Sequence, residues 1–187
     1  VHLKPRIDGN QISFDIKNGA INDETWIQRK NLKCPCCGNI TDVKELKRQF
    51  IAKEPTKKLI AVVIDGQNSK DYRLPTKFEI EAVNNIPQVQ NKPLEKMPIG
   101  NNRDLHCMGW GVELWSDMFT ERQLLLMDTF TKKLTDFKIQ SKEIFKRDYW
   151  EGLLINLSIF VDRVSASNTA FGRWNVAGEK LETPFSR

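Results

Sequence analysis

The feature that most constrains this chain is a short cysteine run, Cys34-Pro35-Cys36-Cys37, followed at once by Gly38. Cys34 and Cys37 stand at the C-x2-C spacing, which places two thiolates on one side of a tight turn. Gly38 permits the positive φ that such a turn needs next. We therefore expect one knuckle of a zinc ribbon, with Cys34 and Cys37 as metal ligands and Cys36 pointing away.

This knuckle supplies only half of a structural zinc site, because such a site needs four ligands. The sequence holds no second C-x2-C pair, so His2, His106 and Cys107 could complete the site only if the fold brought them close. The expectation is a zinc half-site in this chain, and a reduced, metal-free turn is the alternative. Neighbouring cysteines do not pair easily in disulfide geometry, which favours a reducing, cytoplasmic setting.

Residue patterns predict an α+β fold, in which a small zinc-ribbon-like β-hairpin region precedes a long helical hairpin. Residues 2–7 and 11–17 alternate apolar and polar side chains around the turn signal Asp8-Gly9. A second hairpin is predicted over residues 59–64 and 72–74. Its fully apolar first strand is expected to be buried.

Helices are predicted where capping residues precede periodic apolar residues. Thr76 and Glu79 have the capping-box spacing and are expected to start a short helix. Thr120 and Gln123 have the same spacing and are expected to start a long helix. A second long helix is expected over about residues 148–165. The apolar positions of these two helices are Leu124, Met127, Phe130, Leu134 and Phe137, then Trp150, Leu153, Leu154, Leu157, Phe160, Val161 and Val164. Paired as a hairpin, they would bury these faces together or against a sheet.

The stretch 84–108 is rich in Asn, Pro and Lys and shows no period, so it is expected to be a linker or long loop. It separates residues 1–83, the expected zinc-ribbon-like β insert with a short helix, from residues 109–187, the expected helical hairpin and C-terminal tail.

The formal charge of +5 suits a nucleic-acid partner without requiring one. Basic residues frame the second predicted hairpin, where they could contact phosphates; a solvated surface explains them equally well. Polar and aromatic residues also mix in the tail, which suits a nucleic-acid or substrate contact, whereas Trp110 and Trp115 are expected to be core anchors. The candidate nucleic-acid contacts are Lys57, Lys58, Lys70, Arg73, Asn168, Arg173 and Trp174.

Several enzyme signatures are missing from the sequence. It has no Gly-x-Gly-x-x-Gly or Walker phosphate loop, no His-Glu-x-x-His and no Gly-x-Ser-x-Gly elbow. Its two histidines argue against a histidine-based triad. No apolar run approaches the ~20 residues of a membrane-spanning helix. We therefore assign no catalytic and no cofactor-binding residue in this chain and expect no membrane partner.

The second half carries a longer pattern. It consists of Trp115-Ser116-Asp117 before Phe119-Thr120-Glu121-Arg122-Gln123-Leu124, then Val161-Asp162-Arg163, Asn168, Arg173-Trp174, Gly178-Glu179-Lys180 and Thr183-Pro184-Phe185-Ser186-Arg187. It resembles the W-x-D-x-F-T-x-R-Q-L and D-R…N-S…R-W…G-E-K…F-x-R runs of adenine-specific DNA methylases that contain a Zn-ribbon, a family often found beside phage-defence genes. The cysteine knuckle and residues 59–63 and 72–76 resemble that family's zinc-ribbon insert. The resemblance covers nearly the whole chain.

The resemblance implies methyl transfer from S-adenosylmethionine to the exocyclic amine of adenine, on a base extruded from DNA. Family members place an F-x-G-x-G cofactor loop upstream of this insert and a D-P-P-Y motif downstream of the F-x-R, and neither is in this sequence. The resemblance therefore implies an internal segment, with residues 109–187 belonging to the methyltransferase domain. DNA and the remainder of that domain would be its partners, and only the parent protein would bind S-adenosylmethionine. The first residue, Val1, agrees with an internal segment.

Two other function classes fit the same residues. One is a stand-alone zinc-ribbon module that binds nucleic acid without any link to catalysis. The other is a structural interaction domain, in which the helical hairpin docks on a partner through its apolar face.

Overall fold

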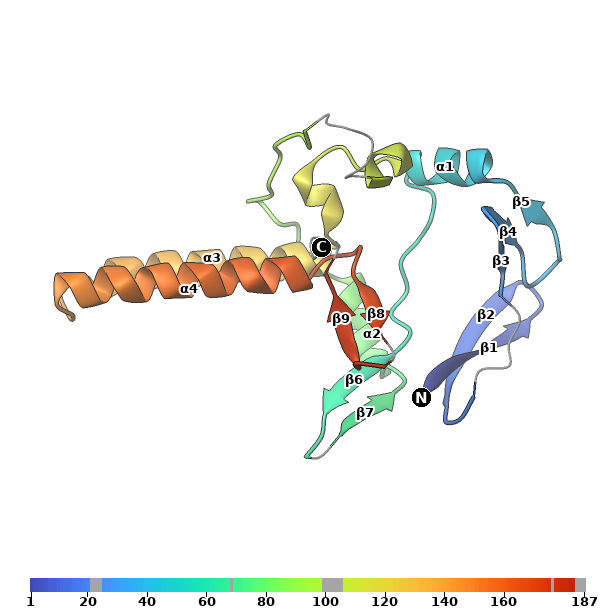
Figure 1. Ribbon diagram of the computed structural model, residues 1–187, viewed down its shortest axis with the longest axis horizontal. Coiled ribbons are helices and arrows are strands. Elements are labelled where there is room, and N and C mark those ends of the chain that lie inside the picture. Colours follow the sequence, from blue (N-terminus) through green and yellow to red (C-terminus); the bar gives the residue numbers. More distant parts are fainter. Residues whose placement is uncertain (21–24, 68, 99–105, 176, 184–187) are drawn as a thin grey trace. The chain divides into compact units, whose positions relative to one another are not determined.

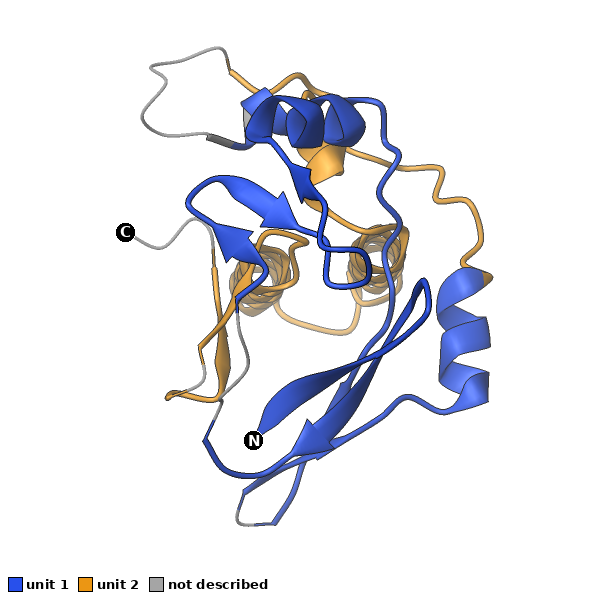
Figure 2. Cartoon of the chain, turned by 90° about the vertical axis from the view of Figure 1, so that its right-hand side faces the viewer, with its two compact units in different colours: residues 1–84, 100–112 blue, residues 85–99, 113–187 orange. Residues whose placement is uncertain are grey.

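A computed structural model describes residues 1–20, 25–67, 69–98, 106–175 and 177–183 (Figure 1). The structure is mixed α+β: small antiparallel hairpins come first and a long helical hairpin follows, as the sequence patterns predict. The chain divides into two compact units (Figure 2). Unit 1 comprises Val1–Asn84 and Gly100–Val112, and unit 2 comprises Asn85–Ile99 and Glu113–Arg187.

Unit 1 begins with the predicted hairpin of β1 (His2–Asp8) and β2 (Gln11–Lys17). The strands pair antiparallel over their full lengths, and Asp8 opposite Gln11 is the last pair before the turn. Gly9 has a φ of 55°, which glycine adopts without the steric penalty of a side chain. The turn lies one residue later than Asp8-Gly9, because Asp8 is part of the strand.

A three-stranded antiparallel sheet follows, with β3 (Ile27–Gln28), β4 (Asn31–Lys33) and β5 (Ile40–Thr41) in that order. The cysteine run connects β4 to β5. Helix α1 (Val43–Ile51) starts directly after β5, because the Asp42 carboxylate caps its first turn by accepting from the amides of residues 44 and 45 at 2.8 and 2.9 Å. Phe50 at its end packs edge-to-face on Trp110 of the 3-10 helix η1 (His106–Trp110), with ring centroids 5.3 Å apart.

The second predicted hairpin is also present, as β6 (Val62–Asp65) and β7 (Lys70–Arg73), and α2 (Lys77–Asn84) follows it. The prediction that its apolar strand is buried is wrong, because the side chains of Val63 and Ile64 are 43% and 41% exposed. Burying such a strand requires cover on both faces. Within the described residues, β6 pairs only with β7, and these two short strands form a ribbon of their own.

Unit 2 contains most of the buried apolar residues of the described chain. Residues 95–97 run alongside the chain that leads into η2 (Trp115–Met118). The amide of Met97 donates to the Glu113 carbonyl at 2.9 Å, and the amide of Trp115 donates to the Glu95 carbonyl at 3.1 Å. Residues 85–98 of the Asn- and Pro-rich stretch therefore supply core residues without forming a helix or a longer strand. The buried apolar residues of unit 2 are Val89, Met97, Met118 and Leu124.

The two long helices, α3 (Glu121–Gln140) and α4 (Arg147–Ser167), lie side by side as the predicted hairpin (Figure 1). Phe130 and Phe160 meet edge-to-face between them at 6.0 Å, although Phe160 is still 54% exposed. Strands β8 (Arg173–Asn175) and β9 (Lys180–Glu182) form a small hairpin after α4. No described helix combines the length and apolar composition needed to cross a bilayer.

Candidate functional site

The cysteine run forms a closed turn between β4 and β5. The Cys34 amide donates to the Asn39 carbonyl at 2.8 Å, and the Gly38 amide donates to the Cys34 carbonyl at 2.9 Å. Gly38 has the positive φ that the sequence predicts, 76°. Because both strands are held in the same antiparallel sheet, the turn between them has a fixed conformation that presents the cysteines together.

Within this turn the Cys34 thiol ionises more readily than the Cys36 thiol. The backbone N–H groups of Cys37 and Cys36 donate to its sulfur, and these bonds lower the pKa of Cys34 below its ordinary value. Desolvation first, and then the nearby Cys34 charge, raise the pKa of Cys36. Amide donors of this kind are what a metal-bound thiolate receives from its surroundings. The turn therefore favours Cys34 as a ligand and disfavours Cys36.

The described residues do not complete a metal site around this turn. They contain no group of three or more His, Cys, Asp or Glu side chains arranged to hold a metal ion. The His106 side chain, one of the candidates to complete the site, lies outside the described part of the structure. A structural zinc needs four ligands, so Cys34 and Cys37 fit such an ion only as half of its coordination shell.

Of the basic candidates in unit 1, Lys58, Lys70 and Arg73 are engaged by the fold itself. Lys58 donates to the Ile12 carbonyl at 3.1 Å. Two nitrogens of Arg73 donate to the Glu79 carboxylate, at 2.7 and 2.6 Å. These two hydrogen bonds are the main reason that the pKa of Glu79 is about 2. Lys57 is exposed, and Lys70 is half-buried in β7. A phosphate at Arg73 would therefore have to displace the carboxylate that caps α2.

The three candidates in unit 2 lie just past the hairpin. Arg173 holds the Glu182 carboxylate across the β8–β9 pair at 2.6 Å, and Trp174 beside it is 40% exposed. Asn168 ends α4, with its amide donating back to the carbonyls of Val164 and Ser165. Its side-chain Nδ2 is buried and has no hydrogen-bond partner among the described residues. Of these candidates, Asn168 is the one with an unused polar group.

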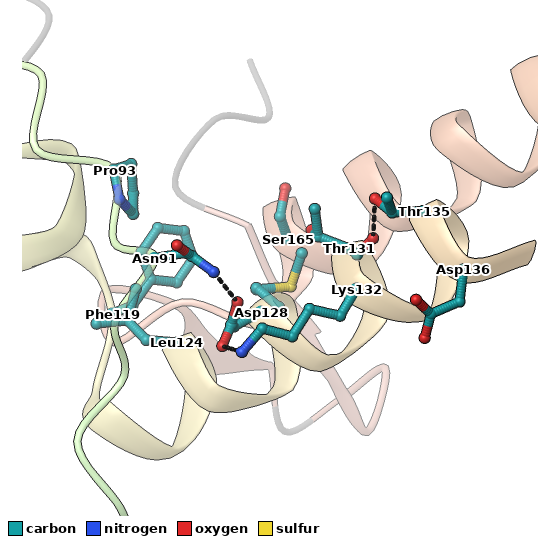
Figure 3. A pocket seen from close by; sticks show the side chains of 11 residues that line it. Asn91, Pro93, Phe119, Leu124, Asp128, Thr131, Lys132, Thr135, Asp136 and Ser165 are labelled. Carbon is teal, nitrogen blue, oxygen red and sulfur yellow. Dashed lines mark hydrogen bonds and ion pairs between the residues drawn. The ribbon is translucent and has the colours of Figure 1, made fainter. Parts of the chain in front are cut away.

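Sequence reasoning missed a hollow of about 590 Å³ along α3, shown in Figure 3. At its centre is the Asp128 carboxylate, only 5% exposed, which binds Lys132 at 2.6 Å and accepts from Asn91 at 3.1 Å. Lys132 first and Asn91 second lower the pKa of Asp128, so it stays ionised and acts as an acceptor. Its sequence signal is an acidic residue four positions after Leu124, on the buried stripe of the helix.

No family model, curated protein or solved structure matches the chain. What the chain does must therefore be inferred from its own residues.

Proposed function

We propose that this chain is an internal, non-catalytic segment of an S-adenosylmethionine-dependent DNA adenine methyltransferase, and that it contributes structure and DNA contacts. Unit 1 would form half of a zinc ribbon, and unit 2 would belong to the methyltransferase domain. The observation that carries the proposal is the Cys34–Cys37 turn, whose amide donors prepare a thiolate at metal-ligand spacing. The methyltransferase part rests on the motif resemblance around residues 115–124 and 161–187.

The local structure of the first of these motifs supports the proposal by giving its polar residues distinct tasks. Asp117 accepts from the amides of Glu113 and Leu114 at 3.0 and 2.9 Å, which fixes the entry into η2. Thr120 and Gln123 form the capping box that starts α3. Arg122 is exposed and has no such task within the described residues. The motif thus builds a helix start and leaves one arginine available for a ligand.

In this proposal the methyl group comes from S-adenosylmethionine, and the residues that bind this cofactor and the target base are supplied by other parts of the parent protein. Zinc would be held by Cys34 and Cys37 together with ligands from outside the described residues. The role of this chain is then to present a rigid turn and positively charged side chains. Such side chains bind phosphates without regard to sequence and make the affinity depend on salt.

The test uses the purified chain with and without added zinc. We expect calorimetric titration to detect no binding of S-adenosylmethionine, and fluorescence anisotropy to detect salt-dependent binding of DNA. Metal analysis should find less than one zinc per chain, and Cys34→Ser should lower that content, whereas the control Cys107→Ser should not. Tight binding of S-adenosylmethionine by this chain would refute the proposal. A parent reading frame without the cofactor loop and the D-P-P-Y motif would refute it equally.

Two other functions predict different results. A stand-alone zinc-ribbon module would bind DNA with one zinc per chain. A structural interaction domain is favoured by the outer surface of the helical hairpin, where Ile139, Ile144 and Ile155 are 71%, 70% and 60% exposed. It would self-associate in sedimentation experiments and show no affinity for DNA at any salt concentration.

A further inference from the structure

Two shallow hollows adjoin at the base of the helical hairpin, where α3 begins and α4 ends. Their volumes are about 330 and 460 Å³, and both are lined by Leu126 of α3 and by Asn168 at the end of α4. Arg163 lines the smaller hollow and Arg122 the larger. The shared walls make them one surface, here called the base groove, with an arginine from each helix.

These two arginines are unengaged within the described residues, unlike most of the arginines that the structure describes. Neither Arg122 nor Arg163 forms an ion pair or side-chain hydrogen bond with the described residues, and both are exposed. On the same helices, Glu121 is held by Lys92 at 2.9 Å, and Asp162 does not line either hollow. Among the described arginines, those that bind a carboxylate are Arg6, Arg48, Arg73, Arg147 and Arg173.

Asn168 adds a donor that the fold leaves unused. Its Nδ2 atom is buried and has no hydrogen-bond partner within the described residues, although its side chain lines both hollows. Most buried polar groups find a partner, because leaving a donor without one is unfavourable. An acceptor atom on a ligand seated in the base groove would remove this deficit.

The base groove also has an apolar part. Leu126 is 40% exposed, and Phe160 is 54% exposed although one edge of it packs on Phe130. Cationic groups beside an exposed aromatic ring are the combination with which proteins bind a nucleic-acid strand, because the cations attract phosphates and the ring stacks on a base. An open surface with its two cations on different helices suits a row of phosphates better than a single enclosed anion.

We propose that the base groove binds a single strand of DNA. Arg122 and Arg163 bind successive phosphates, Phe160 and Leu126 contact an unstacked base, and the Asn168 amide donates to the strand. This proposal rests on the proposed function, in that DNA is the ligand of the chain, and it identifies the surface that does the binding.

The experiment measures binding of a labelled single-stranded oligonucleotide by the full chain at several salt concentrations. The slope of log K against log salt is negative, and each lost phosphate contact reduces its magnitude by about 0.7 for single-stranded DNA. The double variant Arg122→Ala/Arg163→Ala should therefore reduce the magnitude of the slope by about 1.4. The matched control is Lys133→Ala/Lys138→Ala, which removes equal charge from exposed positions of α3 outside both hollows and should leave the slope unchanged.

A second variant separates stacking from charge. Phe160→Leu keeps an apolar side chain against α3 but removes the aromatic face, so we expect affinity to fall on the order of tenfold with an unchanged salt slope. Asn168→Asp replaces a donor by a negative charge of nearly the same size and should also weaken binding. Far-UV circular dichroism and thermal melting will show whether each variant keeps the fold.

The possible failures can be told apart. If the wild-type chain binds DNA and the double arginine variant keeps the full salt slope, the base groove is wrong and the proposed DNA contact survives. The same conclusion follows if the lysine control lowers the slope as much as the arginine variant. If the wild-type chain binds no DNA even at low salt, the DNA contact in the proposed function fails, and the base groove fails with it.

Discussion

Thr169 tests whether hydrogen bonds hold the chain just after α4 against η2. Its side chain is buried, with 4% of the residue exposed, and its hydroxyl donates to the Met118 carbonyl at 2.9 Å. The same oxygen accepts from the Phe171 amide at 3.2 Å. The Met118 carbonyl also accepts from the Ala170 amide at 2.9 Å. The residue immediately after Asn168 is thus fixed to η2 by a small network.

Replacing Thr169 by valine keeps the shape of the side chain and removes the hydroxyl. The Met118 carbonyl retains one donor, and the amide of Phe171 loses its acceptor. A hydrogen bond contributes about 1 kcal/mol net, and Thr169→Val removes two of them, so it should lower the free energy of unfolding by about 2 kcal/mol. Thr169→Ser keeps the hydroxyl and loses one methyl group, which should cost about 0.8 kcal/mol.

Urea unfolding followed by far-UV circular dichroism reports mainly on α3 and α4 and gives these free energies by linear extrapolation. Hydrogen exchange of the Ala170 amide should also accelerate in Thr169→Val, because its acceptor sits in the weakened network. If Thr169→Ser proves more destabilising than Thr169→Val, methyl packing holds this junction and the hydrogen-bond argument is refuted.

Three further predictions follow from individual contacts. The pKa of Glu79 is lowered from 4.5 to about 2, chiefly by Arg73, so the stabilisation that this carboxylate contributes is complete above pH 4.5 and is lost as the pH falls towards 2. Glu79→Gln should flatten that part of the curve of unfolding free energy against pH, measured by urea unfolding. Iodoacetamide at neutral pH should alkylate Cys34 before Cys36, as mass spectrometry of the peptides can show, and the reverse order would contradict the hydrogen-bonded thiolate. Ser141→Ala should cost about 1–2 kcal/mol in the same unfolding assay, because it removes the acceptor, at 3.0 Å, of the Trp150 indole N–H. Trp150→Phe should cost less in that background than in the wild type, because the hydrogen bond is already lost.

Structure that depends on neighbouring residues was predictable from the sequence. The two capping boxes are present where Thr76 and Thr120 predict them, because each needs only a side chain and an amide three residues apart. The first β-hairpin and the second long helix also follow local patterns within a residue or two at their ends, and the first long helix begins where its capping box predicts. The same kind of signal was overlooked at Asp42, which caps α1 ahead of Glu45 and could have identified that helix.

What the sequence could not predict depends on contacts between distant segments. Val89 and Met97 have no periodic pattern around them, yet they are buried in unit 2 because the chain returns alongside η2. Val63 and Ile64 show the opposite error: an apolar run predicts burial only if another layer covers it. Asp128 was hidden in the same way, because its partner Asn91 lies far away in the sequence.

The sequence also could not predict which arginines are paired with carboxylates in the fold. The arginines singled out as DNA contacts from the sequence, Arg73 and Arg173, are the ones that the fold uses internally, because a carboxylate lies within reach of each. A count of basic residues cannot distinguish an arginine bound to glutamate from one that is free, yet phosphate binding at the former must first break an ion pair. Arg122 and Arg163 face no such competition within the described residues. Two arginines that can bind an anion without breaking an ion pair therefore lie on the helices for which the sequence predicts only a structural hairpin, and the salt slope of their variants decides whether they do so.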